Sequence, residues 1–121
     1  IILVREIAAA NEVDIHLIMD AISGFLLFGL LGGILFEVLD LLQPGSLIYE
    51  MPFSGYIYYY YSFITITSVG YGDVLPAFQA AYALALLLGI FGQFYMAIVV
   101  AVFVGKYLSE GRTKNDHISN K

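Results

Sequence analysis

The sequence predicts an all-α membrane protein, with two membrane-spanning helices that flank a shorter segment entering the membrane and turning back. The chain of 121 residues is 60% hydrophobic and only 12% charged, which is outside the range of ordinary soluble domains. It contains two long apolar runs, each able to cross a bilayer. Between them lies an aromatic stretch that ends in a glycine-containing loop.

The first spanning helix is expected over about residues 15–42. Its apolar centre, Ala21 to Leu39, is interrupted only by Ser23 and Glu37. At about 1.5 Å per residue this centre is close to the thickness of the hydrocarbon core. The turn signal Gln43-Pro44-Gly45-Ser46 then ends the helix, because proline and glycine do not continue it.

The aromatic stretch is expected to form a short helix over about residues 55–66, capped by Ser54. On propensity alone, Tyr56 to Tyr61 would be a strand. A lone strand in hydrocarbon would leave its backbone groups unpaired, so a helix is predicted instead. The loop at residues 67–72 follows, and irregular backbone is tolerated at that depth only where it lines a polar path.

The second spanning helix is expected over about residues 77–107, because no charged residue occurs between Val74 and Gly105. Residues 108–121 are polar and are expected to form a mobile tail. The basic residues all lie toward the two ends of the chain and none lies between the spans, so both ends should be cytoplasmic and the chain should lie in the cell membrane. They are Arg5, Lys106, Arg112, Lys114 and Lys121. Residues 1–14 mix apolar and charged side chains, which favours a cytoplasmic interfacial segment, although a solvated end fits the same pattern.

Several functional classes are disfavoured by what the sequence contains. His16 and His117 stand at opposite ends without metal-ligand spacing, and no nucleophile motif is present, so neither enzymatic activity nor an organic cofactor is expected. The net charge of −5 says little about a nucleic-acid partner, because an acidic outer surface would instead concentrate cations at an external mouth, and no nucleic-acid partner is expected. A secondary transporter would need more spans and internal repeats.

The segment Thr65-Ile66-Thr67-Ser68-Val69-Gly70-Tyr71-Gly72-Asp73 resembles the potassium channel family. The resemblance covers about residues 21–107 and implies that residues 15–107 form a pore domain, assembled as a homotetramer in a lipid bilayer. It assigns the selectivity filter to six residues, Thr67, Ser68, Val69, Gly70, Tyr71 and Gly72. Within it, the carbonyls of Ser68, Val69, Gly70 and Tyr71 would bind K⁺ ions, which are cargo.

Residue types fit this assignment, with one departure. Successive carbonyls face one side of a chain only when the backbone alternates in hand, and glycine adopts the left-handed form at little cost. Gly70 and Gly72 have that alternating spacing. Ser68 stands where the family usually has threonine, so the innermost ion site keeps its hydroxyl but loses a methyl that restricts rotation.

The resemblance also implies residues that support the filter and the gate. Tyr60 and Tyr61 occupy positions that are commonly tryptophan, and we expect Tyr60 to reach Asp73 and Tyr61 to pack on Tyr71. Gly92 is the candidate hinge, with Gly89 as its competitor, and either glycine could serve only close packing. The candidate cavity lining consists of Gln93, Met96, Val100 and Val104, although this spacing also describes a packed helix face.

Two alternatives stay open at the level of sequence, a subunit that does not conduct and a cation pore that is not selective. No arginine-rich sensor helix is present in these residues. Because Ile1 is not an initiating methionine, we expect a longer chain in which a sensor domain would lie outside these residues.

Overall fold

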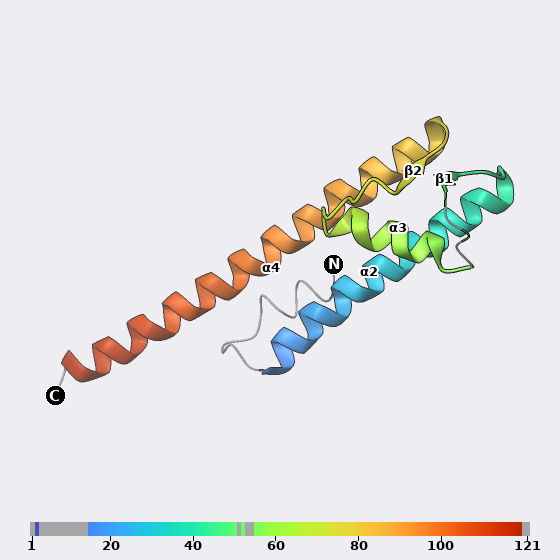
Figure 1. Cartoon of the computed structure of the whole chain (residues 1–121). Coiled ribbons are helices and arrows are strands. Elements are labelled where there is room, and N and C mark those ends of the chain that lie inside the picture. The colour runs from blue at the N-terminus through green and yellow to red at the C-terminus, as the bar shows by residue number, and fades with distance from the viewer. Residues whose placement is uncertain (1, 3–14, 51, 53–54, 120–121) are drawn as a thin grey trace. The chain divides into compact units, whose positions relative to one another are not determined.

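The computed structural model describes residue 2, residues 15–50, residue 52 and residues 55–119. The predicted interfacial segment 1–14 therefore lies, apart from residue 2, outside the described residues. The elements of the described part are α2 (Ile15–Leu42), β1 (Leu47–Tyr49), α3 (Ile57–Ile66), β2 (Val74–Pro76) and α4 (Gln79–Ser119) (Figure 1). Ile15–Leu42 and Gln79–Leu108 are each long and apolar enough to cross a membrane.

Helix α2 ends where the sequence carries its turn signal. Gly45 adopts a left-handed φ of 88°, which a residue with a β-carbon would adopt only at a cost. The Asp40 carboxylate closes the turn, because its Oδ1 accepts the backbone N–H groups of Gly45 at 3.0 Å and of Ser46 at 2.8 Å. The chain thus leaves the helix along a fixed path.

A small antiparallel sheet, which the sequence did not predict, ties together the segments on either side of α3. Strand β1 pairs with β2 in the register Leu47↔Pro76, Ile48↔Leu75 and Tyr49↔Val74. The backbone N–H of Ala77 also donates to the carbonyl of Ser46 at 2.9 Å. The connection after α2 and the connection before α4 therefore hold each other in place.

Helix α3 contains most of the aromatic run, in the helical conformation that the membrane argument favoured. It begins at Ile57, two residues later than expected, with Tyr56 at the N-cap position and no side-chain cap hydrogen bond. The expected cap, Ser54, lies outside the described residues. Ile57, Tyr61 and Ile64 recur with helical spacing and are buried in one core with Phe36 of α2.

Glycines let α2 approach α3 closely. A β-carbon on Gly29 would overlap the Phe63 ring, and one on Gly33 would overlap the Tyr59 ring. The Ser62 hydroxyl donates to the carbonyl of Gly29 at 2.7 Å, so the two helices are also joined by a hydrogen bond. Gly29 and Gly33 thus act as the packing pair that their spacing indicated.

The second long helix differs from the expectation at its end. We expected it to stop near residue 107 and to be followed by a mobile tail, but α4 continues to Ser119. The polar composition that suggested a tail is also compatible with a helix that is exposed to solvent, so polarity by itself does not end a helix.

The chain divides into two compact units. The first comprises residues 25–94, with α3, both strands and the adjoining parts of α2 and α4. The second joins α2 up to Gly24 to α4 from Tyr95 onward. In this second unit Leu17, Ala21 and Val99 form a small core. The Tyr95 hydroxyl donates to the carbonyl of Ala21 at 2.6 Å, which attaches the two helices to each other.

Candidate functional site

The backbone that follows α3 alternates in hand. The φ angle is 57° at Ser68, 51° at Gly70 and 78° at Gly72, and Ser68 is the only non-glycine residue with positive φ in the described part of the chain. Val69 and Tyr71, which lie between these residues, are therefore not left-handed. Such alternation turns successive carbonyl groups toward the same side of the chain.

Glycine is required at positions 70 and 72 because of the backbone conformation there, and not because a β-carbon would lack space. A β-carbon added to either residue would meet nothing within 4 Å in the single chain. Their left-handed φ angles are nevertheless ones that only glycine adopts readily. Ser68 adopts such an angle as well, and this feature of the segment was not predicted from the sequence.

The start of the segment is hydrogen-bonded to the last turn of α3. The backbone N–H groups of Ser68 and Gly70 donate to the carbonyls of Thr65 and Ile64, at 3.1 and 3.0 Å. The Thr67 hydroxyl donates to the Phe63 carbonyl at 2.6 Å, so Thr67 caps the helix end in addition to leading into the loop. These donors point back toward α3 and fix the path of the loop.

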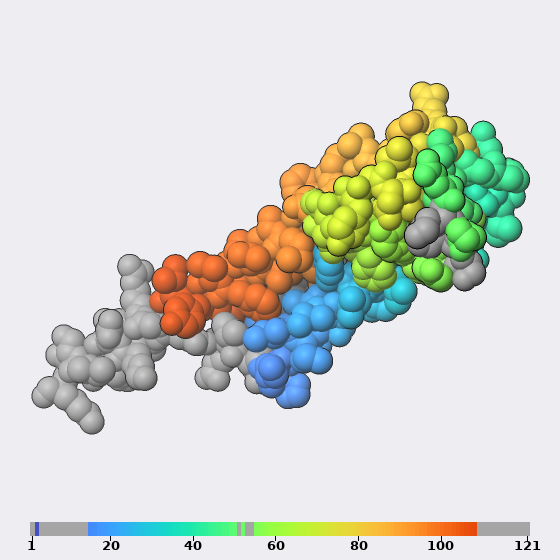
Figure 2. All heavy atoms as spheres, viewed as in Figure 1, coloured from blue at the N-terminus to red at the C-terminus, as the bar shows by residue number. Residues whose placement is uncertain are grey.

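Residues 67–72 are all exposed in the single chain, although α3 behind them is largely buried. Their atoms, yellow-green, lie uncovered on the face of the molecule that Figure 2 shows. The exposed fraction is 52% for Val69 and 73% for Tyr71, so two apolar side chains of the segment lack cover from their own chain.

The far end of the segment is attached to α3 by Tyr60. Its hydroxyl donates to Oδ2 of Asp73 at 2.5 Å, so the expected contact between the two residues is present. This hydrogen bond to a carboxylate raises the pKa of Tyr60 to about 12. The phenol therefore stays protonated at neutral pH and remains a donor.

Tyr61 lies on the buried side of α3. Its ring meets the Phe36 ring edge to face, with centroids 5.0 Å apart and an angle of 86° between the planes. Tyr61 thus anchors α3 on α2. Packing of Tyr61 on Tyr71 stays a prediction.

Two further tyrosines of α3 also donate to carboxylates, which the sequence reasoning missed. The Tyr58 hydroxyl donates to Oδ2 of Asp40 at 2.8 Å, and the Tyr59 hydroxyl donates to Oε2 of Glu37 at 3.1 Å. The available signal was the pair Glu37 and Asp40, which lie one helical turn apart on α2.

On its other side, the segment contacts α4. Gln93 Nε2 donates to the Ser68 hydroxyl oxygen at 2.6 Å and lies 3.4 Å from the Ile66 carbonyl oxygen. A β-carbon on the neighbouring Gly92 would lie 2.8 Å from that same carbonyl oxygen, whereas one on Gly89 would meet only Thr65, at 3.9 Å. Gly92 therefore permits close packing against the end of α3, and its role as a hinge stays a prediction.

The remaining candidate lining residues are exposed in the single chain. Met96, Val100 and Val104 each keep between 42% and 53% of their surface exposed. They belong to the second unit, whereas residues 67–72 belong to the first, so their placement relative to residues 67–72 stays a prediction.

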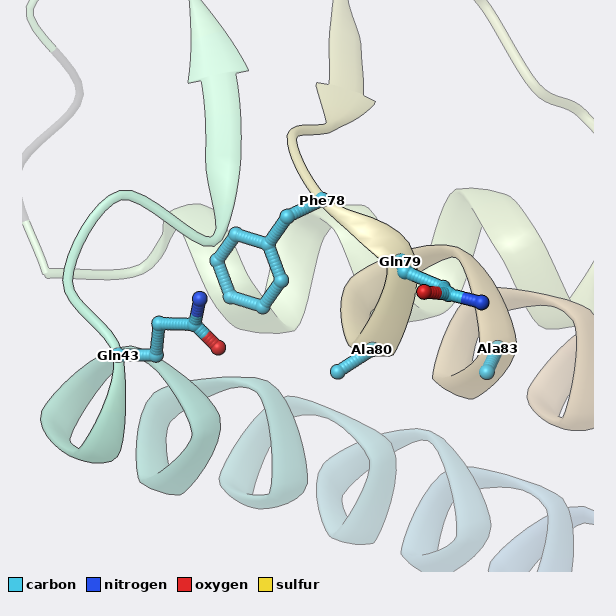
Figure 3. Close-up of a pocket in the computed structure, with 5 residues that line it drawn as sticks. All are labelled: Gln43, Phe78, Gln79, Ala80 and Ala83. Carbon is cyan, nitrogen blue, oxygen red and sulfur yellow. The ribbon is translucent and has the colours of Figure 1, made fainter.

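Two open hollows lie in the first unit. One, of about 430 Å³, lies between α4 and the start of the segment 67–72 and includes Ser68 and Gln93 among its lining residues. The other, of about 460 Å³, lies where α2 ends and α4 begins. Figure 3 shows Gln43 and Phe78 in the space between these two helix ends, with Ala80 and Ala83 on α4. No charged side chain lines this second hollow.

The described residues therefore form a channel-like membrane fold, with two long apolar helices and a short helix that ends in a loop of alternating hand. A family model described as "Ion channel" matches residues 24–109, which is more than half of the chain. The chain belongs to this family of two-transmembrane pore-loop ion channels, whose function is passive ion conduction and not enzymatic catalysis. Neither the curated proteins nor the solved structures contain a match to the chain.

Proposed function

We propose that the chain forms the pore of a potassium-selective channel and that residues 67–72 are its selectivity filter. The observation that carries the proposal is the alternation of φ at Ser68, Gly70 and Gly72. K⁺ is bound most simply by replacing its water shell with rings of backbone carbonyl oxygens, and a chain of alternating hand can supply such a row. The carbonyls of Ser68, Val69, Gly70 and Tyr71 are the proposed ligands.

The pore is a homotetramer in this proposal. One segment offers oxygens from one side only, so several identical chains must surround the ion. The exposed side chains of Val69 and Tyr71 support this assembly, because a neighbouring copy could cover them. In this arrangement α3 is a re-entrant pore helix, and its partly negative C-terminal end favours a cation near the filter.

The chain is oriented with both ends in the cytoplasm of the cell, and the filter opens to the outside. This orientation rests on the basic residues, all of which lie toward the two ends of the chain and none of which lies between the two spans. Glu50 and Asp73 belong to the connection between the spans, and Asp40 lies in the last turn of α2 next to it. These carboxylates would concentrate cations at an external mouth.

Rubidium uptake into liposomes containing the purified chain tests the function, because Rb⁺ closely resembles K⁺ in size. The proposal predicts uptake that external K⁺ suppresses at a far lower concentration than external Na⁺ does. Equal suppression by both ions would indicate a cation pore without selectivity. No uptake above that of protein-free liposomes would indicate a subunit that does not conduct.

Light scattering of the purified chain in mild detergent tests the assembly separately. After correction for bound detergent, the mass should correspond to four chains. A stable monomer or dimer would contradict the tetramer.

A further inference from the structure

Gln93 contacts the filter segment from α4 at a single point. Its Nε2 lies 2.6 Å from the Ser68 hydroxyl oxygen, which is a short distance for a nitrogen donor. The two residues are far apart in the chain, and the adjacent Gly92 brings the backbone of α4 up to the Ile66 carbonyl. The filter and the second spanning helix are therefore joined by a side chain placed for that contact.

The Ile66 carbonyl determines the orientation of the Gln93 side-chain amide. A carbonyl oxygen only accepts hydrogen bonds, so the Gln93 atom that faces it at 3.4 Å must be the NH₂ group and not the amide oxygen. The same NH₂ group has a second hydrogen, which is directed to Ser68. The Ser68 hydroxyl oxygen is consequently the acceptor of this bond.

That polarity determines what the Ser68 hydroxyl can do. A hydroxyl has one donor and two acceptor positions, and the amide occupies one of the acceptor positions. The other lone pair is left for a cation, and the hydroxyl cannot rotate freely without losing its partner. Serine lacks the methyl that limits rotation in threonine, so the Gln93 amide supplies a restraint that the side chain itself does not have.

We propose that Gln93 is a positioning residue for the innermost ion site, because its amide holds the Ser68 hydroxyl oxygen in the orientation that coordinates K⁺. This inference rests on the proposed function, since it assigns a role within that filter. Gln93 is thereby a determinant of selectivity that acts through Ser68.

A double-mutant cycle measures this dependence in the rubidium assay. Gln93→Leu removes the amide, and Gln93→Met does so while keeping an unbranched side chain. Each is combined with Ser68→Ala, which removes the hydroxyl on which Gln93 acts. Gln79→Leu, at the other glutamine of α4, is the matched control. Only variants that elute as the same oligomer as the parent are compared, and the readout is the external Na⁺ concentration that halves Rb⁺ uptake.

Loss of one neutral hydrogen bond should lower that concentration by about three- to tenfold in both Gln93 variants. Gln79→Leu should not change it, and neither Gln93 substitution should lower it further when Ser68 is already alanine. A parent channel that distinguishes Rb⁺ from Na⁺ but is unaffected by both Gln93 substitutions would overturn this inference alone. The inference would also be overturned if the Gln93 and Ser68 substitutions lowered this Na⁺ concentration additively in the double variants. Gln93 would then act independently of the Ser68 hydroxyl. A parent channel without selectivity would overturn the proposed function, and this inference with it.

Discussion

At the scale of single residues, the filter segment depends on three left-handed positions. Gly70 and Gly72 adopt them without a β-carbon, whereas Ser68 adopts a φ of 57° at a steric cost. Its backbone N–H donates to Thr65, and its hydroxyl accepts from Gln93, so neighbouring groups on α3 and α4 hold the strained residue. Serine rarely adopts this conformation, and its sequence neighbours give no sign of it.

We expect Gly70→Ala and Gly72→Ala each to abolish rubidium uptake while leaving membrane insertion intact. A left-handed φ costs alanine about 1–2 kcal/mol, so the backbone should relax and turn its carbonyls away from the ions. Gly55→Ala is the control, because an added β-carbon there meets nothing and the residue is not left-handed. Normal, selective uptake by either filter variant would show that the alternating backbone does not bind the ions.

The opposite end of the segment depends on the hydrogen bond from Tyr60 to Asp73. Because the folded chain raises the pKa of Tyr60 from 10.0 to about 12, the folded state favours the protonated phenol. Its contribution to stability is complete below pH 10 and is lost as the pH rises toward about 12. The contact is therefore insensitive to pH in the physiological range.

We expect Tyr60→Phe to shorten the period over which rubidium uptake is sustained, because Asp73 and the end of the filter lose their attachment to α3. Initial uptake should persist, since Phe keeps the ring. Tyr82→Phe removes a hydroxyl from α4 without touching the Asp73 contact and serves as the control. The time course of uptake at constant ion gradient measures the effect, and an unchanged time course would mean that the hydrogen bond does not support the filter.

At the scale of elements, α3 is positioned by its contacts with α2. Gly29 and Gly33 remove side-chain volume from α2 where the rings of Phe63 and Tyr59 lie. The hydroxyl of Ser62 then bonds the carbonyl of Gly29. The proposed filter follows directly from the end of α3, so an error in this packing would displace the proposed ion ligands.

We expect Gly29→Ala to destabilise the protein by about 1–3 kcal/mol, because the added methyl overlaps the Phe63 ring in a packed core. Gly105→Ala makes the same substitution within α4, where the added carbon meets nothing in the single chain. It should instead stabilise α4 by about 0.5–1 kcal/mol through helix propensity. Thermal unfolding in detergent, followed by circular dichroism, distinguishes the two. Equal transition temperatures for both variants would contradict the assigned packing.

The elements could be predicted where one physical requirement dominated. Span length and Pro44 determined α2, and the need to satisfy backbone groups in lipid favoured a helix over a strand for the tyrosine run. Strands β1 and β2 have three residues each, and they form only because the fold brings them together. The end of α4 was placed too early, because polarity was treated as if it ended the helix.

The candidate site, too, could be predicted from the sequence only in part. The left-handed glycines followed from residue types and spacing, whereas the contact between Tyr60 and Asp73 followed from the resemblance to the potassium channel family. The contact between Gln93 and Ser68 did not, because it joins two residues that only tertiary packing brings together. Gln93 was expected to line the cavity, although an amide in an apolar helix can equally satisfy a neighbouring polar group.

At the scale of the whole molecule, the exposed apolar surface is what a membrane chain requires. Large hydrophobic side chains are exposed along both candidate spans, among them Leu27 on α2 and Leu86 on α4. In lipid such surface needs no cover, so it does not by itself indicate an interface. The exposed Val69 and Tyr71 differ, because they lie beside a backbone whose proposed ligands must be surrounded by further chains.

The central claim is that this chain forms a potassium-selective pore, and the reversal potential under bi-ionic conditions tests it most directly. The purified chain is placed in a planar bilayer with K⁺ as the only cation on one side and Na⁺ as the only cation on the other. Our account predicts a reversal potential far from zero, with the sign that a K⁺-selective conductance produces. A conducting channel whose current reverses at zero would contradict it, because carbonyls aligned by this backbone would then not distinguish K⁺ from Na⁺.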